Sequence, residues 1–175
     1  KKWIYALIIL TAFTMVIVSN HFRYEDSGTN IKEEIISLEK HVAETDDIEA
    51  KRQLASKYYW TSDFEKAIPL LKEVLGERLN DTEVLHQLVI SYFAKEEYVL
   101  AKEYSERLLE FDSHNSVALM NLAQLHFLLG DEKQFIDYIY QAIEASYING
   151  GDELEVRFYR NLNTLIEDHQ ALVEK

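Results

Sequence analysis

Residues 48–81 read IEAKRQLASKYYWTSDFEKAIPLLKEVLGERLND, residues 82–115 read TEVLHQLVISYFAKEEYVLAKEYSERLLEFDSHN, and residues 116–147 read SVALMNLAQLHFLLGDEKQFIDYIYQAIEASY. Placed under one another, the three segments match at a spacing of 34 residues. The aligned positions are Leu54 with Leu88 and Leu122, Ala55 with Val89 and Ala123, Tyr58 with Tyr92 and His126, Phe64 with Tyr98, Ala67 with Ala101 and Phe135, and Leu75 with Leu109 and Ile143. A fixed period of this length indicates stacked copies of one supersecondary unit.

A leucine, a small residue, an aromatic residue and then an alanine, repeated every 34 residues, resemble the tetratricopeptide repeat (TPR) family. The resemblance implies three helical hairpins, at residues 48–81, 82–115 and 116–147, stacked into an α-solenoid. Asp46 or Asp47 is expected to cap the first helix, and the second helix is expected to stop near Gly76. Phe135 replaces the small residue of the third hairpin, which must therefore be splayed or repacked.

The amino-acid composition supports an all-α chain, and the net charge argues against a nucleic-acid partner. Hydrophobic residues make up 47% of the 175 residues, with one proline, five glycines and no cysteine. This composition suits a helical array and leaves no thiol chemistry. The formal net charge of −13 opposes binding to nucleic-acid phosphates. We therefore expect no nucleic-acid partner.

Residues 1–24 are predicted to form a transmembrane anchor. A helix from Trp3 to Phe22 would span roughly 29 Å, close to the thickness of the hydrocarbon core. Lys1 and Lys2 favour a cytoplasmic N-terminus, which would place the repeats on the extracytoplasmic side. The alternative is a cleaved signal peptide and a secreted protein, although Ile17-Val18-Ser19 matches a cleavage site poorly.

Two further segments flank the repeats. Residues 25–47 contain a polar connector and an amphipathic helix, with apolar residues at Ile31, Ile35, Leu38 and Val42. This helix either covers the open end of the array, which we favour, or forms a dimer seam. Residues 148–175 leave the repeat register and are predicted to be an amphipathic capping helix.

In the resembled family, the first helix of each hairpin lines a concave groove that binds a peptide or a helix. Carried over by register, the resemblance implies a protein-binding groove made of Arg52, Gln53, Ser56, Tyr59, Trp60, His86, Gln87, Ile90, Phe93, Asn121, Gln124 and Phe127. Tyr59, Phe93 and Phe127 occupy equivalent positions and are expected to form an aromatic stripe. The alternative is that flanking helices cover one or more of these rings. A clamp for terminal carboxylates is disfavoured, because Arg52 is the one cation at the matching positions.

The sequence contains no recognisable catalytic constellation. The six histidines have no metal-ligand spacing, and Gly150-Gly151 indicates a turn rather than a phosphate-binding loop. Acidic pairs such as Glu96-Glu97 are interpreted as helix caps and solvated faces. We expect no enzyme activity, no cofactor and no metal.

The predicted function is that of a membrane-anchored scaffold whose extracytoplasmic groove holds a partner protein or peptide. By analogy of architecture, this scaffold would serve envelope complex assembly or secretion. The alternatives are a secreted, chaperone-like binding module and an accessory or catalytic subunit of an enzyme.

Overall fold

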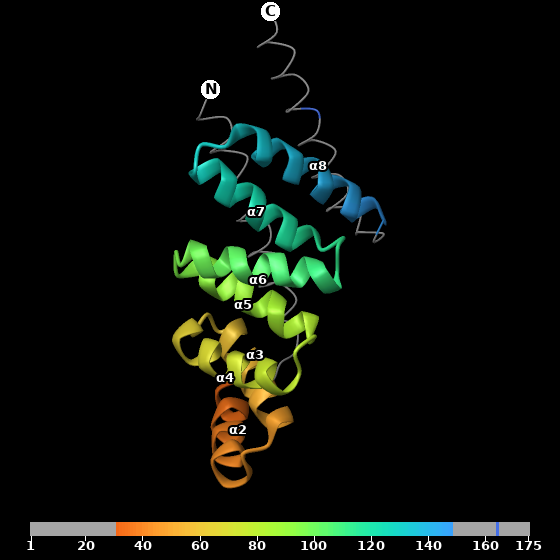
Figure 1. Ribbon diagram of the computed structural model, residues 1–175. Helices are drawn as coiled ribbons and strands as arrows, with labels where there is room; N and C mark the ends of the chain where they lie inside the picture. Colours follow the sequence, from red (N-terminus) through yellow and green to blue (C-terminus); the bar gives the residue numbers. More distant parts are fainter. Residues whose placement is uncertain (1–30, 149–163, 165–175) are drawn as a thin grey trace, which may run out of the picture. The chain divides into compact units, whose positions relative to one another are not determined.

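The computed structural model describes residues 31–148 and Thr164, and this part of the chain is helical without any strand (Figure 1). The helices are α2 (Ile31–Thr45), α3 (Ile48–Trp60), α4 (Phe64–Glu77), α5 (Thr82–Ala94), α6 (Tyr98–Phe111), α7 (Ser116–Leu128) and α8 (Glu132–Ile148). The expected all-α class is confirmed for these residues, and α3 with α4 and α7 with α8 pack as helical pairs. The predicted anchor (1–24) and, apart from Ile148 and Thr164, the predicted capping segment lie outside the described residues. Among the helices that are described, none combines the length and apolarity needed to span a bilayer.

The chain divides into two compact units, with the boundary inside α6 between Tyr104 and Ser105. In the unit that holds residues 31–104, α3 packs against α4, and α4 packs against α5. Ala67 and Leu71 of α4 are fully buried, and so are Leu85 and Leu88 of α5. The small side chain of Ala67 suits the close approach of two helices that the repeat register predicts.

The pre-repeat helix α2 packs against α3 in the same unit. Ile35 and Leu38 are half-buried, and none of the residues of α2 is fully buried. Glu39 lies 3.9 Å from the Lys66 ammonium and accepts a hydrogen bond from the Tyr58 hydroxyl. Contact with α3 is what the covering alternative predicts.

In the unit that holds residues 105–148, α7 and α8 lie side by side as an antiparallel pair (Figure 1). Phe135 stands where the earlier hairpins have alanine, yet it is fully buried, as is Ile139 one turn later. The Phe135 ring lies 5.5 Å from the Phe127 ring, centroid to centroid. The third hairpin therefore encloses the larger side chain.

The turn inside each hairpin has the same geometry. Ser62, Glu96 and Gly130, spaced 34 residues apart, have φ angles of 60°, 60° and 77°. The following residue donates its backbone N–H to a carbonyl five positions earlier, for example from Asp63 to Tyr58 at 2.8 Å. These left-handed residues and their paired hydrogen bonds form a Schellman motif at the end of α3, α5 and α7.

The first helix of each hairpin begins at an equivalent cap. Asp47, Asp81 and Asn115 accept hydrogen bonds from backbone N–H groups at the starts of α3, α5 and α7. These contacts satisfy amides that have no partner within the helix. Of the two aspartates expected to cap α3, Asp47 is the one that does so. α4 ends at Glu77, one residue beyond Gly76, near which the sequence predicted its end.

Candidate interaction surface

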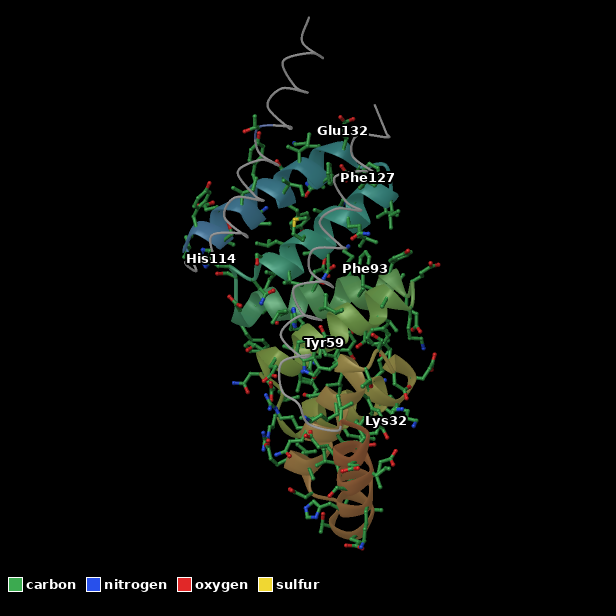
Figure 2. The ribbon with its side chains drawn as sticks, turned by 180° about the vertical axis from the view of Figure 1, so that it is seen from behind. Lys32, Tyr59, Phe93, His114, Phe127 and Glu132 are labelled. Carbon is green, nitrogen blue, oxygen red and sulfur yellow. The ribbon has the colours of Figure 1, made fainter. Side chains whose placement is uncertain are left out.

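The predicted groove residues lie on the first helices of the hairpins, α3, α5 and α7. Figure 2 labels Tyr59 on α3, Phe93 on α5 and Phe127 on α7. Residues of α3 and α5 belong to one compact unit, and those of α7 belong to the other. Each group is therefore described by itself.

Ser56 and Gln87 link α3 to α5 through two hydrogen bonds between their side chains. The Ser56 hydroxyl donates to Gln87 Oε1 at 3.2 Å and accepts from Gln87 Nε2 at 3.0 Å. Gln87 is only 2% exposed. Its amide is therefore engaged within the array.

Arg52 also joins these two helices. Its Nε donates to Asp81 Oδ2 at 2.9 Å, and its Nη2 pairs with Glu83. The hydrogen bond to Asp81 raises the pKa of Arg52 despite the opposing effect of burial. Burial alone would raise the pKa of Asp81, but hydrogen bonds from Arg52 and from the Val84 N–H outweigh it and lower that pKa. Arg52 therefore has a structural role, whatever else it contacts.

Two rings of the predicted aromatic stripe are buried. Tyr59 and Phe93 are 6% and 5% exposed. The Tyr59 ring lies 5.0 Å from Trp60 and 6.3 Å from Phe64, and burial raises the pKa of Tyr59 to about 12. This corrects the expectation that all three rings face a partner. The alternative, in which neighbouring helices cover part of the stripe, describes Tyr59 and Phe93.

The reason lies in the second helices of the hairpins. Phe64 of α4 and Tyr98 of α6 are both large aromatic residues, and they stand at equivalent positions. The Tyr98 ring meets Phe93 at 5.3 Å with an interplanar angle of 65°, an edge-to-face contact. Phe127 is half-buried against Phe135.

The other predicted residues vary in exposure. Gln53 is exposed, whereas Ile90 is buried. His86 is half-buried, and burial lowers its pKa against the opposing effect of Glu83. Trp60 and Gln124 are half-buried. These residues lie on α3, α5 and α7, the first helices of the hairpins, and their role in binding stays a prediction.

Asn121 differs from its equivalents in the earlier hairpins. It is 7% exposed, and its Nδ2 donor has no hydrogen-bond partner in the described part of the chain. One repeat earlier, the equivalent Gln87 is paired with Ser56. The two equivalent amides thus differ in hydrogen bonding within the described residues.

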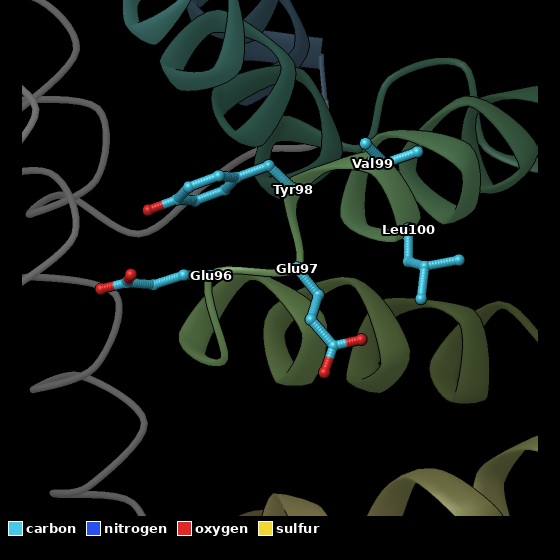
Figure 3. A pocket seen from close by; sticks show the side chains of 5 residues that line it. All are labelled: Glu96, Glu97, Tyr98, Val99 and Leu100. Atoms are coloured by element: carbon cyan, nitrogen blue, oxygen red, sulfur yellow. The ribbon is translucent and has the colours of Figure 1, made fainter.

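The turn after α5 contains a pocket that the sequence did not indicate. It has a volume of about 340 Å³ and is lined by Glu96, Glu97, Tyr98, Val99 and Leu100 (Figure 3). The sequence by itself indicates only helix caps and solvated faces for Glu96-Glu97. The alignment of Glu96 with Gly130 is the signal that could have marked this turn as unusual.

Within the residues that the structure describes, no group of three or more His, Asp or Glu side chains could hold a metal ion. The repeated features of the candidate surface are instead hydrogen-bonding amides and rings.

No family model matches the sequence, and no curated protein matches it either. Among solved structures, "MamA MSR-1 C2" has a TM-score of 0.65 at 17% identity, over 74% of this chain and 74% of that one. "Crystal structure of MamA" has a TM-score of 0.62 at 15% identity, over 83% of this chain and 92% of that one. These likenesses support a TPR-like fold for this chain.

Proposed function

We propose that this protein is an interaction scaffold whose hairpin array holds a segment of a partner protein along α3, α5 and α7. Stacked helical hairpins present an extended surface to which every repeat contributes equivalent positions. The TPR-like fold supports this proposal. No catalytic role is part of it.

The observation that carries the proposal is that the buried Nδ2 donor of Asn121 has no hydrogen-bond partner among the described residues. A buried donor without a partner costs about 1–3 kcal/mol, because it loses its hydrogen bonds to water. A main-chain carbonyl of a bound segment would supply the missing acceptor. Gln124 and Phe127 follow at helical spacing on α7 and would contact the same segment. A partner backbone is therefore the ligand that best suits this position.

The test is site-specific crosslinking in native membranes. A photoreactive residue at position 124 of the full chain should capture a protein partner, which is identified after purification. Asn121→Leu, which replaces the amide by an apolar side chain of similar size, should reduce that capture about tenfold, equivalent to about 1.4 kcal/mol. Its melting temperature should be unchanged or higher, because an unsatisfied donor has been removed.

The matched control is Gln141→Leu, which replaces an exposed amide on α8 by leucine. It should capture the partner at the wild-type yield. Equal yields from Asn121→Leu and the wild type would refute the role of Asn121, and so would equal losses in both variants.

We further propose that the scaffold is membrane-anchored through residues 3–22, with its repeats on the extracytoplasmic side, and acts in envelope complex assembly or secretion. The apolar run from Trp3 to Val18, preceded by Lys1 and Lys2, supports anchoring. A secreted, signal-cleaved binding module is the alternative. Membrane fractionation distinguishes them.

A further inference from the structure

The pocket at the turn between α5 and α6 combines a carboxylate with apolar and aromatic walls. In Figure 3 the Glu96 carboxylate and the Tyr98 ring extend toward the same side of the turn. Tyr98 is fixed by its edge-to-face contact with Phe93 at 5.3 Å. Val99 is 81% exposed, and Leu100 is half-buried. The pocket is open, and its volume of about 340 Å³ admits a large side chain.

Glu96 is the carboxylate of this turn that remains available. The Lys95 ammonium lies 2.8 Å from Glu65 and 3.0 Å from Glu97, and these hydrogen bonds raise the pKa of Lys95. Glu96 is exposed, and its carboxylate forms no hydrogen bond or ion pair with any described residue. No described residue therefore neutralises this negative charge at the pocket.

We propose that this pocket binds an arginine side chain of a basic segment in a partner protein. A guanidinium can form a bidentate pair with the Glu96 carboxylate. Its planar face can also stack on the Tyr98 ring, which an ammonium group does less well.

The charge of the whole chain favours the same partner. A net charge of −13 attracts basic segments over long range and raises their rate of encounter. The pocket then supplies the short-range selection, since a carboxylate beside an aromatic ring distinguishes arginine from other residues. The residues of this pocket are different from those proposed to bind a partner around Asn121, so either proposal can fail without the other.

The backbone conformation at Glu96 makes Glu96→Gly an informative variant. Its φ of 60° is a conformation that glycine adopts at lower cost, and the third hairpin has Gly130 at this position. Glu96→Gly should therefore leave the melting temperature unchanged or higher while removing the carboxylate. Lost binding in this variant cannot be attributed to lost folding.

The test is an NMR titration of the full chain with the peptide acetyl-Gly-Gly-Arg-Gly-Gly-amide. We expect saturable shifts confined to the backbone amides of residues 96–100. Replacing the arginine by citrulline, which is neutral and of nearly the same shape, should weaken binding about tenfold. Tyr98→Leu keeps an apolar wall but removes the ring, and it should reduce the preference for arginine over lysine.

Glu96→Gly should weaken the arginine peptide about tenfold, whereas Glu103→Gln should bind within about twofold of the wild type. Glu103 is an exposed residue of α6, and its replacement makes the same change in net charge outside the pocket. Equal losses in the two variants would mean diffuse charge attraction and would overturn the proposal. Wild-type affinity in Glu96→Gly, or the absence of saturable shifts at residues 96–100, would overturn it as well.

Discussion

The left-handed backbone conformation at the turn of each hairpin is adopted by three different residue types. These residues are Ser62, Glu96 and Gly130. A residue with a Cβ atom costs about 1–2 kcal/mol more than glycine in the left-handed region. Nothing lies within 4 Å of the Cβ position that an alanine would add at Gly130, so the backbone alone decides the effect there. The single residue at this position thus sets part of the stability of each hairpin.

Gly130→Ala should lower the free energy of unfolding by about 1 kcal/mol. Ser62→Gly should raise it by a smaller amount, about 0.5 kcal/mol, because glycine also gains entropy in the unfolded chain. Urea unfolding followed by circular dichroism measures both. A neutral Gly130→Ala would show that the turn adapts to an alanine.

Ala67→Leu should overpack the contact between α3 and α4 and reduce the stability by about 1–3 kcal/mol. Ala67 is fully buried, whereas Ala94, at the end of α5, is exposed. Ala94→Leu is therefore the matched control and should change the stability little. Equal unfolding midpoints for the two variants would disprove the packing role of Ala67.

Phe93→Ala should act on folding before it acts on binding. The side chain is 5% exposed, and its removal leaves a cavity that costs about 3–5 kcal/mol. Phe127→Ala, on a half-buried ring, should cost less. Thermal unfolding of the two variants compares these costs, and similar melting temperatures would contradict the difference in burial.

At the scale of helices, the Asp81 side chain at the start of α5 both caps its own helix and contacts α3. Asp81 Oδ1 accepts from the Val84 N–H at 3.1 Å, and Oδ2 accepts from Arg52 of α3 at 2.9 Å. Asn115 caps α7 through the same kind of backbone hydrogen bond without a charge. The charge of Asp81 is therefore dispensable for capping and serves the link between α3 and α5.

Asp81→Asn should keep the cap and lose the ion pair, with a loss of about 1 kcal/mol at pH 7. Because the folded-state pKa of Asp81 is lowered, the carboxylate stabilises the fold fully above the unfolded-state pKa of about 3.9 and loses this effect as the pH falls further. The stability difference between wild type and variant should thus shrink below about pH 4.

Urea unfolding at several pH values measures this difference. Asp81→Ala is the companion variant, since it also loses the cap and should cost about 0.5–2 kcal/mol more. A difference between wild type and Asp81→Asn that stays constant down to acid pH would contradict the assignment.

At the scale of the whole molecule, the proposed anchor at residues 3–22 predicts where the protein is found in the cell. If residues 3–22 form an anchor, a carbonate wash should leave the full chain in the membrane fraction, and protease added from the extracytoplasmic side should digest the repeats. A chain that begins at Glu25 should be released by the same wash. Release of the full chain with a new N-terminus near Asn20 would instead support the secreted alternative.

The sequence alone determines much of the architecture, because helices and turns depend on residues close together in the chain. The 34-residue period marks the hairpins, and Asp47, Asp81 and Asn115 stand at equivalent cap positions. The buried alanine at position 67 also follows from the register. Periodicity predicts which face of its helix a residue lies on, but it does not predict which side chains pack against that face.

The tertiary structure alone decides which residues on those faces remain available. Phe64 and Tyr98, on the second helices, lie against Tyr59 and Phe93, so these rings are buried despite their position in the predicted groove. Asp81 engages Arg52, and Ser56 engages Gln87, whereas the Nδ2 donor of Asn121 has no partner in the described residues. Exposure and pairing depend on side chains about 30 residues away in the chain, and a pattern within one helix carries no information about their size or hydrogen-bonding groups.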